Sequence, residues 1–279
     1  MNPQADLGIF LVSVCAGLIG SLAGVGGGIL VIPALTTFFG VDIHLAVGAS
    51  IVSVIATSSG AASAYVRDRM TDMRLGMFLE LATTTGAVCG ALIAAYVAPA
   101  LLYLLLGIVV LMSAGMQASR LGEEIPAAEP DGIAARLRLS GTYPDRHLGR
   151  EIPYAARRVP AGFLLMWLAG AVSGLLGIGS GVLKVLAMDG AMRLPMKVSS
   201  ATSNFMIGVT AAASAGIYIG RGDVDPRIAG PVALGVLAGA LTGARILHRI
   251  SNRSVRIVFL PVLIAVGLEM IGRAAGLSV

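Results

Sequence analysis

One lysine and two glycine-rich runs stand out as groups that could bind a small anion. Lys184 lies inside an apolar segment, away from any charged loop, where an unpaired charge is costly in lipid. The glycine runs interrupt apolar segments of the same kind, and each glycine costs a helix about 1 kcal/mol relative to alanine. A helix that breaks in a membrane frees backbone N–H groups, which attract an anion at the start of a half-helix. We therefore expect Lys184 to supply charge and the two runs to bind the anion: Gly26, Gly27 and Gly28, and Gly179, Ser180 and Gly181.

Simpler explanations exist for both features. Lys184 could snorkel to the membrane surface if its segment is short and re-entrant. Gly20, Gly24 and Gly28 have the spacing that lets two helices pack closely, which is compatible with a binding role. A nucleotide-binding loop is excluded, because the run lacks the Lys-Ser/Thr ending of a P-loop and the acidic residue of a Rossmann site.

Hydroxyl side chains form a second polar feature. Ser50, Ser53 and Thr57 share one face of an expected helix over residues 43–66. Over residues 196–219, Ser203 and Thr210 repeat the outer pair, and Asn204 adds an amide. Such hydroxyls often bond only to their own helix. Their recurrence in two segments favours a polar lining around the glycine breaks.

Acidic residues are few in the apolar segments. Glu80 and Glu269 lie near expected segment ends, and Asp189 follows the second glycine segment. Any of them could carry a coupling proton, but their positions favour solvated acids. The sequence has no pattern typical of a metal site or of a nucleophile and its base, so we expect neither an enzyme nor a cofactor.

Composition places these residues in a helical membrane protein. The 279 residues are 56% hydrophobic and 13% charged, with a mean hydropathy of +0.87. The net charge of +5 comes from loop residues, so we expect membrane topology and no nucleic-acid partner to explain it. Hydropathy predicts segments at 7–23, 27–39, 43–66, 75–97, 100–117, 160–176, 180–192, 196–219, 228–248 and 255–272.

The chain also contains an internal duplication. Residues 10–91 align with residues 163–244 without a gap, which pairs Gly28 with Gly181 and Ser50 with Ser203. Each copy has five segments, and an odd number predicts that the second copy is inverted in the membrane. We expect an all-α polytopic protein with two inverted-topology repeats and 8–10 spans, depending on whether the glycine segments cross or re-enter.

The basic residues predict the orientation. Fifteen of the 20 Arg and Lys residues fall in the loops 67–74, 118–158, 193–197 and 249–256, which therefore face the cytoplasm, with the N-terminus outside. The predicted division is a first transmembrane repeat (1–117), a cytoplasmic linker (118–159) and a second transmembrane repeat (160–279). Within the linker we expect a short helix near 131–139 and a hairpin over 141–154.

Paired motifs carry a resemblance to a known family. The stretches GSLAGVGGGILVIPAL and AVGASIVSVIATSSGAASAY, followed by GAVSGLLGIGSGVLKVLAM and PMKVSSATSNFMIGVTAAASAGIYIGRGDVDP, resemble the sulfite exporter family of TauE/SafE type. The resemblance implies an inner-membrane transporter, usually an exporter, for sulfite or small organosulfur anions. It adds Thr202, Ser203 and Asn204 as the family's Thr-Ser-Asn stretch. Two residues depart from the family pattern, Ser180 at a glycine position and Leu186 at a proline position.

Together these features predict a secondary transporter of small sulfur oxyanions or organosulfonates, such as sulfoacetate, that exports them across the bacterial inner membrane by alternating access. The anion would lie between the two glycine breaks, with Lys184, Ser50, Ser203 and Asn204 as ligands. A passive anion channel and a non-transporting scaffold that acts through the linker are the alternatives. The lipid bilayer is the expected surrounding, and the sequence leaves a homodimer open.

Overall fold

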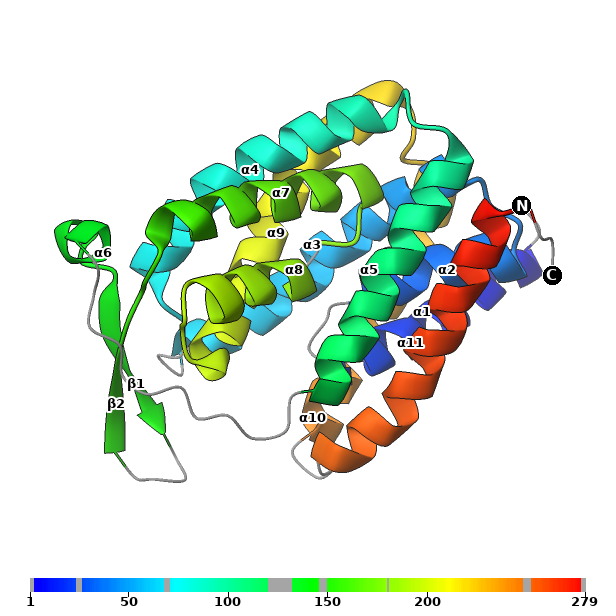
Figure 1. Ribbon diagram of the computed structural model, residues 1–279. Coiled ribbons are helices and arrows are strands. Elements are labelled where there is room, and N and C mark those ends of the chain that lie inside the picture. Colours follow the sequence, from blue (N-terminus) through cyan, green and yellow to red (C-terminus); the bar gives the residue numbers. More distant parts are fainter. Residues whose placement is uncertain are drawn as a thin grey trace.

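The chain forms an all-α fold with one short hairpin (Figure 1). The computed structural model describes residues 3–23, 27–67, 71–119, 132–145, 150–179, 181–247 and 252–276. The helices are α1 (Pro3–Ala23), α2 (Gly28–Phe38), α3 (Ile43–Arg67), α4 (Met73–Ala94), α5 (Pro99–Ser119), α6 (Gly132–Leu137), α7 (Val159–Leu176), α8 (Gly181–Leu186), α9 (Met196–Arg221), α10 (Pro226–Leu247) and α11 (Asn252–Ala274). A π-helical turn, η1 (Ala187–Ala191), continues α8, and strands β1 (Ser140–Asp145) and β2 (Arg150–Ala155) form the hairpin. Each predicted apolar segment coincides with a helix, so the all-α prediction is confirmed.

Helices from the two predicted repeats interleave. Helix α1 packs along α10, α4 along α7 and α9, and α3 along both α9 and α10. Helices α5 and α11 form a further pair beside them (Figure 1). The fourth helix of each predicted repeat therefore packs mainly on helices of the other repeat, so the two sequence halves share one interior.

Glycines allow the closest of these contacts. A Cβ on Gly86 of α4 would lie 2.1 Å from the Trp167 carbonyl oxygen of α7, so no side chain fits there. At the positions 153 residues away, a Cβ on Gly239 of α10 would lie 2.1 Å from the Val14 carbonyl oxygen of α1. Small residues at such crossings bring backbones together, which drives helix association in lipid. The same glycine contact thus occurs at equivalent positions in both copies of the duplicated sequence.

We expect Gly86→Ala to destabilise the protein, because the added methyl group overlaps the Trp167 backbone and forces α4 and α7 apart. Overpacking of this kind costs about 1–3 kcal/mol. Gly216→Ala is the matched control, since Gly216 is exposed on α9 with nothing within 4 Å of its added Cβ. Thermal unfolding in detergent should show a lower midpoint for Gly86→Ala alone. Equal midpoints for both variants would contradict the close-packing role.

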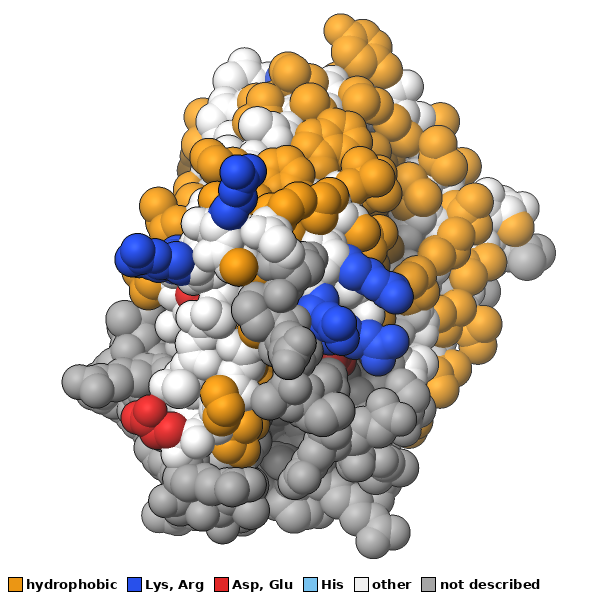
Figure 2. All heavy atoms as spheres, turned by 60° about the vertical axis from the view of Figure 1, so that its left-hand side comes forward, with side chains coloured by type: hydrophobic (Ala, Val, Ile, Leu, Met, Phe, Trp, Pro, Cys, Tyr) orange, Lys and Arg blue, Asp and Glu red, His pale blue; other side chains and the backbone are white. Residues whose placement is uncertain are grey.

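Polarity is distributed as expected for a protein in lipid. Large apolar side chains are exposed along the long apolar helices, including Met77 and Leu81 of α4 and Leu164 of α7. Many serine and threonine hydroxyls, in contrast, are buried in the interior. Within the described residues, α4 and α7 are both long and apolar enough to cross a bilayer. Figure 2 shows the hairpin end of the molecule, where basic side chains gather beside a broad apolar band. Exposed arginines at this end are Arg74, Arg136, Arg138, Arg157, Arg158 and Arg193.

The linker folds onto the helices. Strands β1 and β2 pair antiparallel, with Gly141 opposite Tyr154, so the predicted hairpin is confirmed, as is a short helix, α6, before it. Leu139, Tyr143 and Tyr154 are buried in one apolar cluster with Leu75 and Leu79 of α4. The hairpin is therefore attached to the end of the bundle at which α4 begins.

Candidate functional site

The two glycine breaks meet at Ser50. The Ser50 hydroxyl lies 2.9 Å from the carbonyl oxygen of Gly177, directly after α7, and 3.2 Å from that of Gly28, at the start of α2. A Cβ on Gly28 would lie 2.7 Å from the Ser50 Oγ and 3.6 Å from the Gly177 oxygen. Gly177 itself has a left-handed backbone (φ +65°) that ends α7. Two helix breaks far apart in sequence are thus held together by one buried hydroxyl.

The second copy repeats the local contact. Ser203 Oγ donates to the carbonyl oxygen of Gly181 at 3.1 Å, as Ser50 does to that of Gly28. A Cβ on Gly181 would lie 2.6 Å from Ile207, and a Cβ on Gly28 would lie 2.5 Å from Val54 at the equivalent position. The first turn of each half-helix therefore lies directly against α3 or α9, in the same way in both copies.

Tyr218 forms hydrogen bonds with backbone carbonyls at the end of α7. Its hydroxyl donates to the carbonyl oxygen of Gly174 at 2.7 Å, with that of Leu175 at 3.1 Å, and the side chain is fully buried. Carbonyls in the last turn of a helix have no partner within the helix, and in an apolar interior they need one. Hydroxyls from α3 and α9 thus provide hydrogen bonds for the carbonyls that the breaks release.

Lys184 is completely buried, one helical turn after Gly181. Its side chain is 0% exposed, and Nζ donates to Thr210 Oγ1 at 2.6 Å. Snorkelling to a surface is therefore wrong as an explanation of this lysine. A buried ammonium group needs a compensating charge.

Glu80 supplies that charge. Its Oε1 accepts hydrogen bonds from Thr210 Oγ1 at 2.7 Å and from Thr84 Oγ1 at 3.0 Å, and the residue is only 6% exposed. The prediction that Glu80 is a solvated acid is wrong, because α4 begins at Met73 and carries Glu80 two turns into the bundle. Thr210 thus stands between a buried cation and a buried anion.

This charged network exists in one copy of the duplication. The positions 153 residues away from Lys184, Thr210 and Glu80 hold Val31, Thr57 and Ala233. Thr57 bonds only within its own helix, to carbonyls of residues three and four positions earlier. The buried charges therefore make the otherwise similar copies chemically different.

The remaining predicted site residues lie in different places. Thr202 accepts a hydrogen bond from the backbone N–H of Asp72, before α4, at 3.1 Å. Asn204 Nδ2 donates to the Ser200 carbonyl of its own helix at 2.9 Å. Gly27 packs against Val236 of α10, and Gly179 (φ +71°) against Ile207 and Val54. Gly26 and Ser180 lie outside the described residues. Of the predicted site residues, Ser50 thus contacts Gly28, and Ser203 contacts Gly181. Thr202 instead bonds to the backbone in front of α4.

Asp72 connects the linker to the helix that carries Glu80. Its Oδ1 accepts the backbone N–H of Leu75 and caps α4, and its Oδ2 accepts the Tyr154 hydroxyl of β2 at 2.8 Å. Burial, together with the neighbouring Asp72 carboxylate, raises the pKa of Tyr154 well above its usual value. The phenol therefore stays protonated and keeps donating at physiological pH.

We expect Tyr154→Phe to loosen the hairpin without unfolding the bundle. The variant loses one hydrogen bond to a charged acceptor, worth about 1.5–3 kcal/mol, while the ring packing is retained. Limited proteolysis should cut residues 140–155 faster in this variant than in the wild type. Thr142→Ala, which removes an exposed bond to Glu151 within the hairpin, is the control and should be cut at the wild-type rate. Equal rates for all three proteins would contradict the anchoring role of Asp72.

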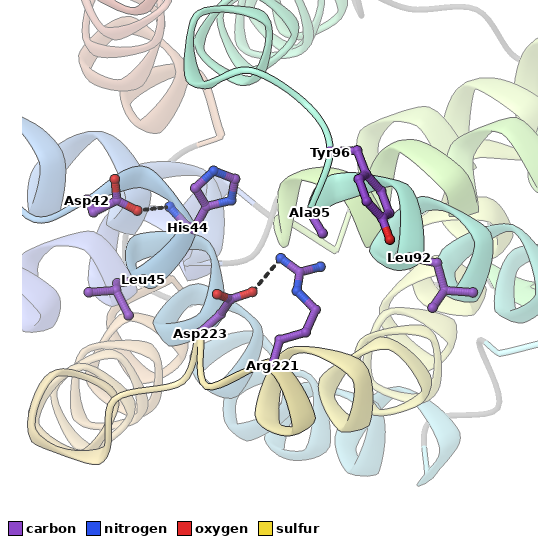
Figure 3. Close-up of a pocket in the computed structure, with 8 residues that line it drawn as sticks. All are labelled: Asp42, His44, Leu45, Leu92, Ala95, Tyr96, Arg221 and Asp223. Carbon is purple, nitrogen blue, oxygen red and sulfur yellow. Dashed lines mark hydrogen bonds and ion pairs between the residues drawn. The ribbon is translucent and has the colours of Figure 1, made fainter.

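A cavity of about 690 Å³ opens at the opposite end of α4 (Figure 3). It is lined by Asp42, His44, Leu45, Leu92, Ala95, Tyr96, Arg221 and Asp223. Arg221 pairs with Asp223, donates to the Ala91 carbonyl at 2.7 Å and lies 4.9 Å above the Tyr218 ring. Arg221 thus connects the lining of this cavity with Tyr218, whose hydroxyl bonds to the last turn of α7.

The sequence indicates Glu80 as a possible proton carrier but not its burial or its partners in the network. Its partners Thr210 and Lys184 come from the other half of the chain, so no local pattern marks it. The available signal was the absence of an acid at the equivalent position, Ala233. A charged residue that is present in one copy and absent from the other indicates a function that arose in that copy after the duplication.

Interleaved apolar helices, two helix breaks in contact and a buried charged network are features of polytopic membrane transporters. Comparison with known families agrees, since the model of the family "Sulfite exporter TauE/SafE" matches residues 9–270. The chain belongs to the sulfite exporter TauE/SafE family, and the resemblance seen in the motifs is confirmed.

Relatives from Bacillus subtilis (strain 168) extend over most of the chain. The probable membrane transporter protein YunE is 26% identical over 94% of this chain and 96% of its own length. The probable membrane transporter protein YdhB is 29% identical over 85% of this chain and 88% of its own length. No solved structure matches the chain. The protein is therefore similar to membrane transporters along nearly its whole length.

Proposed function

We propose that this protein is a secondary transporter that exports small sulfur-containing anions, sulfite or organosulfonates such as sulfoacetate, across the bacterial inner membrane. The observation that carries the proposal is the meeting of the two helix breaks at Ser50, together with a fully buried lysine one turn into the half-helix that follows the second break. Broken helices that face each other inside a membrane are typical of transporter binding sites. The description of the family supports a sulfur oxyanion as the substrate class.

The anion would bind where the half-helices begin. Lys184 would provide a positive charge, and hydrogen bonds would come from the Asn204 amide, from backbone N–H groups near Gly26–Gly28 and Gly179–Gly181, and from the hydroxyls of Ser50 and Ser203 once these turn from the backbone carbonyls to the anion. Such groups suit a sulfite or sulfonate head, which has several acceptor oxygens and a negative charge. The apolar walls formed by Val54 and Ile207 limit the size of the ligand.

Transport would proceed by alternating access. The repeats would have inverted topology, with the N-terminus outside and the linker in the cytoplasm, so that movement of one repeat against the other opens the site to either side. An inside-negative potential favours expulsion of an anion by about 2.3 kcal/mol per charge per 100 mV. The direction of net transport therefore depends on whether a co-ion travels with the anion.

Two measurements test this proposal. A thermal-shift screen of purified protein with sulfite, sulfate, thiosulfate, sulfoacetate and taurine should give a raised melting temperature for at least one sulfur anion, because a ligand that binds the folded state stabilises it. Proteoliposomes loaded with that anion should then show saturable uptake of labelled anion by counterflow. Flux without saturation or counterflow would indicate a passive channel. If no sulfur anion stabilises the protein and no flux is detected, the transporter proposal is contradicted. The alternative of a non-transporting scaffold that acts through the linker is then favoured.

A further inference from the structure

We propose that Glu80 binds a proton each time an anion binds at Lys184, so that the protein moves anion and proton together. This inference rests on the proposed function, because it requires an anion that contacts Lys184. It adds the coupling ion and assigns a residue on α4 to it.

Lys184, Thr210 and Glu80 form one chain of contacts. Thr210 Oγ1 accepts from Lys184 Nζ at 2.6 Å, and its one hydroxyl proton has two acceptors within reach, Glu80 Oε1 at 2.7 Å and the Met206 carbonyl oxygen at 2.8 Å. In this state the Glu80 carboxylate acts through Thr210 as the internal counter-charge of the lysine. An incoming anion competes with the same carboxylate for the same cation.

The other oxygen of Glu80 lies in a different environment. Oε2 is enclosed by protein, and among the described residues it has no hydrogen-bond partner. Oε1, in contrast, accepts from both Thr210 and Thr84. A buried carboxylate oxygen without a donor is costly while the group is charged. Oε2 is thus the atom on which an added proton relieves the largest cost.

Charge balance links the two events. Lys184 and Glu80 contribute one positive and one negative charge, so the network is neutral overall. A bound monovalent anion would leave one uncompensated negative charge in an apolar interior, unless Glu80 takes up a proton. The balanced step is therefore one anion binding at Lys184 and one proton binding at Glu80 Oε2, with no covalent change in the anion.

Few other groups near Glu80 could take this role. Helix α7 contains no titratable side chain, and on α8 the only one is Lys184 itself. On α9, Lys197 lies in the first turn, more than three turns before Thr210, and Tyr218 and Arg221 bond to carbonyls of residues 174 and 91, towards the other end of α4. On α4, Asp72 and Arg74 lie at the hairpin end, and Cys89 lies more than two turns beyond Glu80. Lys184 is thus the titratable group that faces Glu80.

The coupling has a consequence for energetics. A monovalent anion that travels with one proton carries no net charge, so the membrane potential does not drive it. Export then depends on the concentration gradients of the anion and the proton. The anion and its proton then move from the side where the product of their concentrations is higher to the side where it is lower.

Calorimetry with methanesulfonate tests the inference, because this anion stays ionised between about pH 5.5 and 8 and cannot itself take up the proton. Titrations of wild-type protein in buffers with different ionisation enthalpies should show uptake of one proton per anion. The dissociation constant should fall about tenfold for each unit decrease in pH. Glu80→Gln mimics the protonated acid and should bind with the same affinity at every pH, without proton uptake. Glu269→Gln is the matched control, because Glu269 pairs with Arg273 and accepts from Thr37 elsewhere, and should behave as the wild type.

Different outcomes separate the failure of this inference from that of the proposed function. Binding that Lys184→Ala abolishes, but that takes up no proton in the wild type, overturns the role of Glu80 and leaves the anion site intact. Glu80→Gln that keeps the wild-type pH dependence overturns it too. If Glu80→Gln does not fold, calorimetry of the wild type remains as the test. Uptake of one proton per anion then supports the inference, and no proton uptake overturns it. Binding that Lys184→Ala leaves unchanged, or no binding of any sulfur anion, overturns the site and the inference together.

Discussion

Lys184→Ala is expected to lower the flux of sulfite or sulfonate through reconstituted protein by about 100-fold. The variant removes the buried positive charge of the proposed site, and a hydrogen bond to a charged partner contributes about 1.5–3 kcal/mol. The measurement is the initial rate of labelled anion uptake in proteoliposomes with matched amounts of folded protein. Wild-type flux in the variant would contradict the assignment of Lys184 as the counter-charge.

The chain provides its own control for this experiment. Val31 occupies the equivalent position in the first copy and is buried to the same extent. Val31→Ala removes side-chain volume from the equivalent place in the fold but no charge. The loss of two methyl groups costs about 1–2 kcal/mol of stability. For matched amounts of folded protein we therefore expect a flux within about threefold of the wild type. A large loss of flux in Val31→Ala would show that packing, not charge, limits transport.

Stability and transport can be separated further. Lys184→Ala leaves Glu80 buried without its cation, and breaking a buried pair costs about 3–5 kcal/mol. The double variant Lys184→Ala/Glu80→Gln removes both charges and should recover most of the lost melting temperature. It should not recover flux, because the anion still lacks its counter-charge.

The helices could be predicted from sequence because each one is a continuous apolar segment with a clear end. Gly40, the loop at 67–74 and Gly222 interrupt apolar runs, and the observed helices stop at these places. The hairpin was predictable for a similar reason, since turn-forming residues separate its strands. These features depend on neighbours in sequence, which a single chain shows directly.

The packing of those helices could not be predicted in the same way. A duplication indicates which segments are equivalent, but not that α4 packs on α7 and α9 while α10 packs on α1 and α3. The site shows the same limit. Ser50 could be assigned to a polar helix face, but its link to Gly177 spans 127 positions, and the link from Glu80 to Thr210 spans 130.

Ser50→Ala is expected to cause the second large effect, because it removes the hydroxyl that joins the two breaks. The Gly177 carbonyl, the nearer acceptor, would lose this donor in a buried position, where a lost partner costs about 1–3 kcal/mol, and the contact of the same hydroxyl with the Gly28 carbonyl would be lost with it. Thermal unfolding in detergent should show a clear decrease in the melting temperature. Flux per folded molecule should also decrease, since the half-helices would no longer be held at a fixed separation.

Comparison with two other serines makes the expected order specific. Ser203 donates to one carbonyl, that of Gly181, so Ser203→Ala should cost less than Ser50→Ala. Ser53 is equally buried but bonds only to the Ser50 carbonyl of its own helix, so Ser53→Ala should cost least, at roughly 0.5 kcal/mol. An equal loss for Ser50→Ala and Ser53→Ala would mean that burial of a hydroxyl, and not its contact with the breaks, determines the effect. The predicted order follows because, of these three serines, Ser50 alone contacts the breaks of both copies, so its loss affects both half-helices at once.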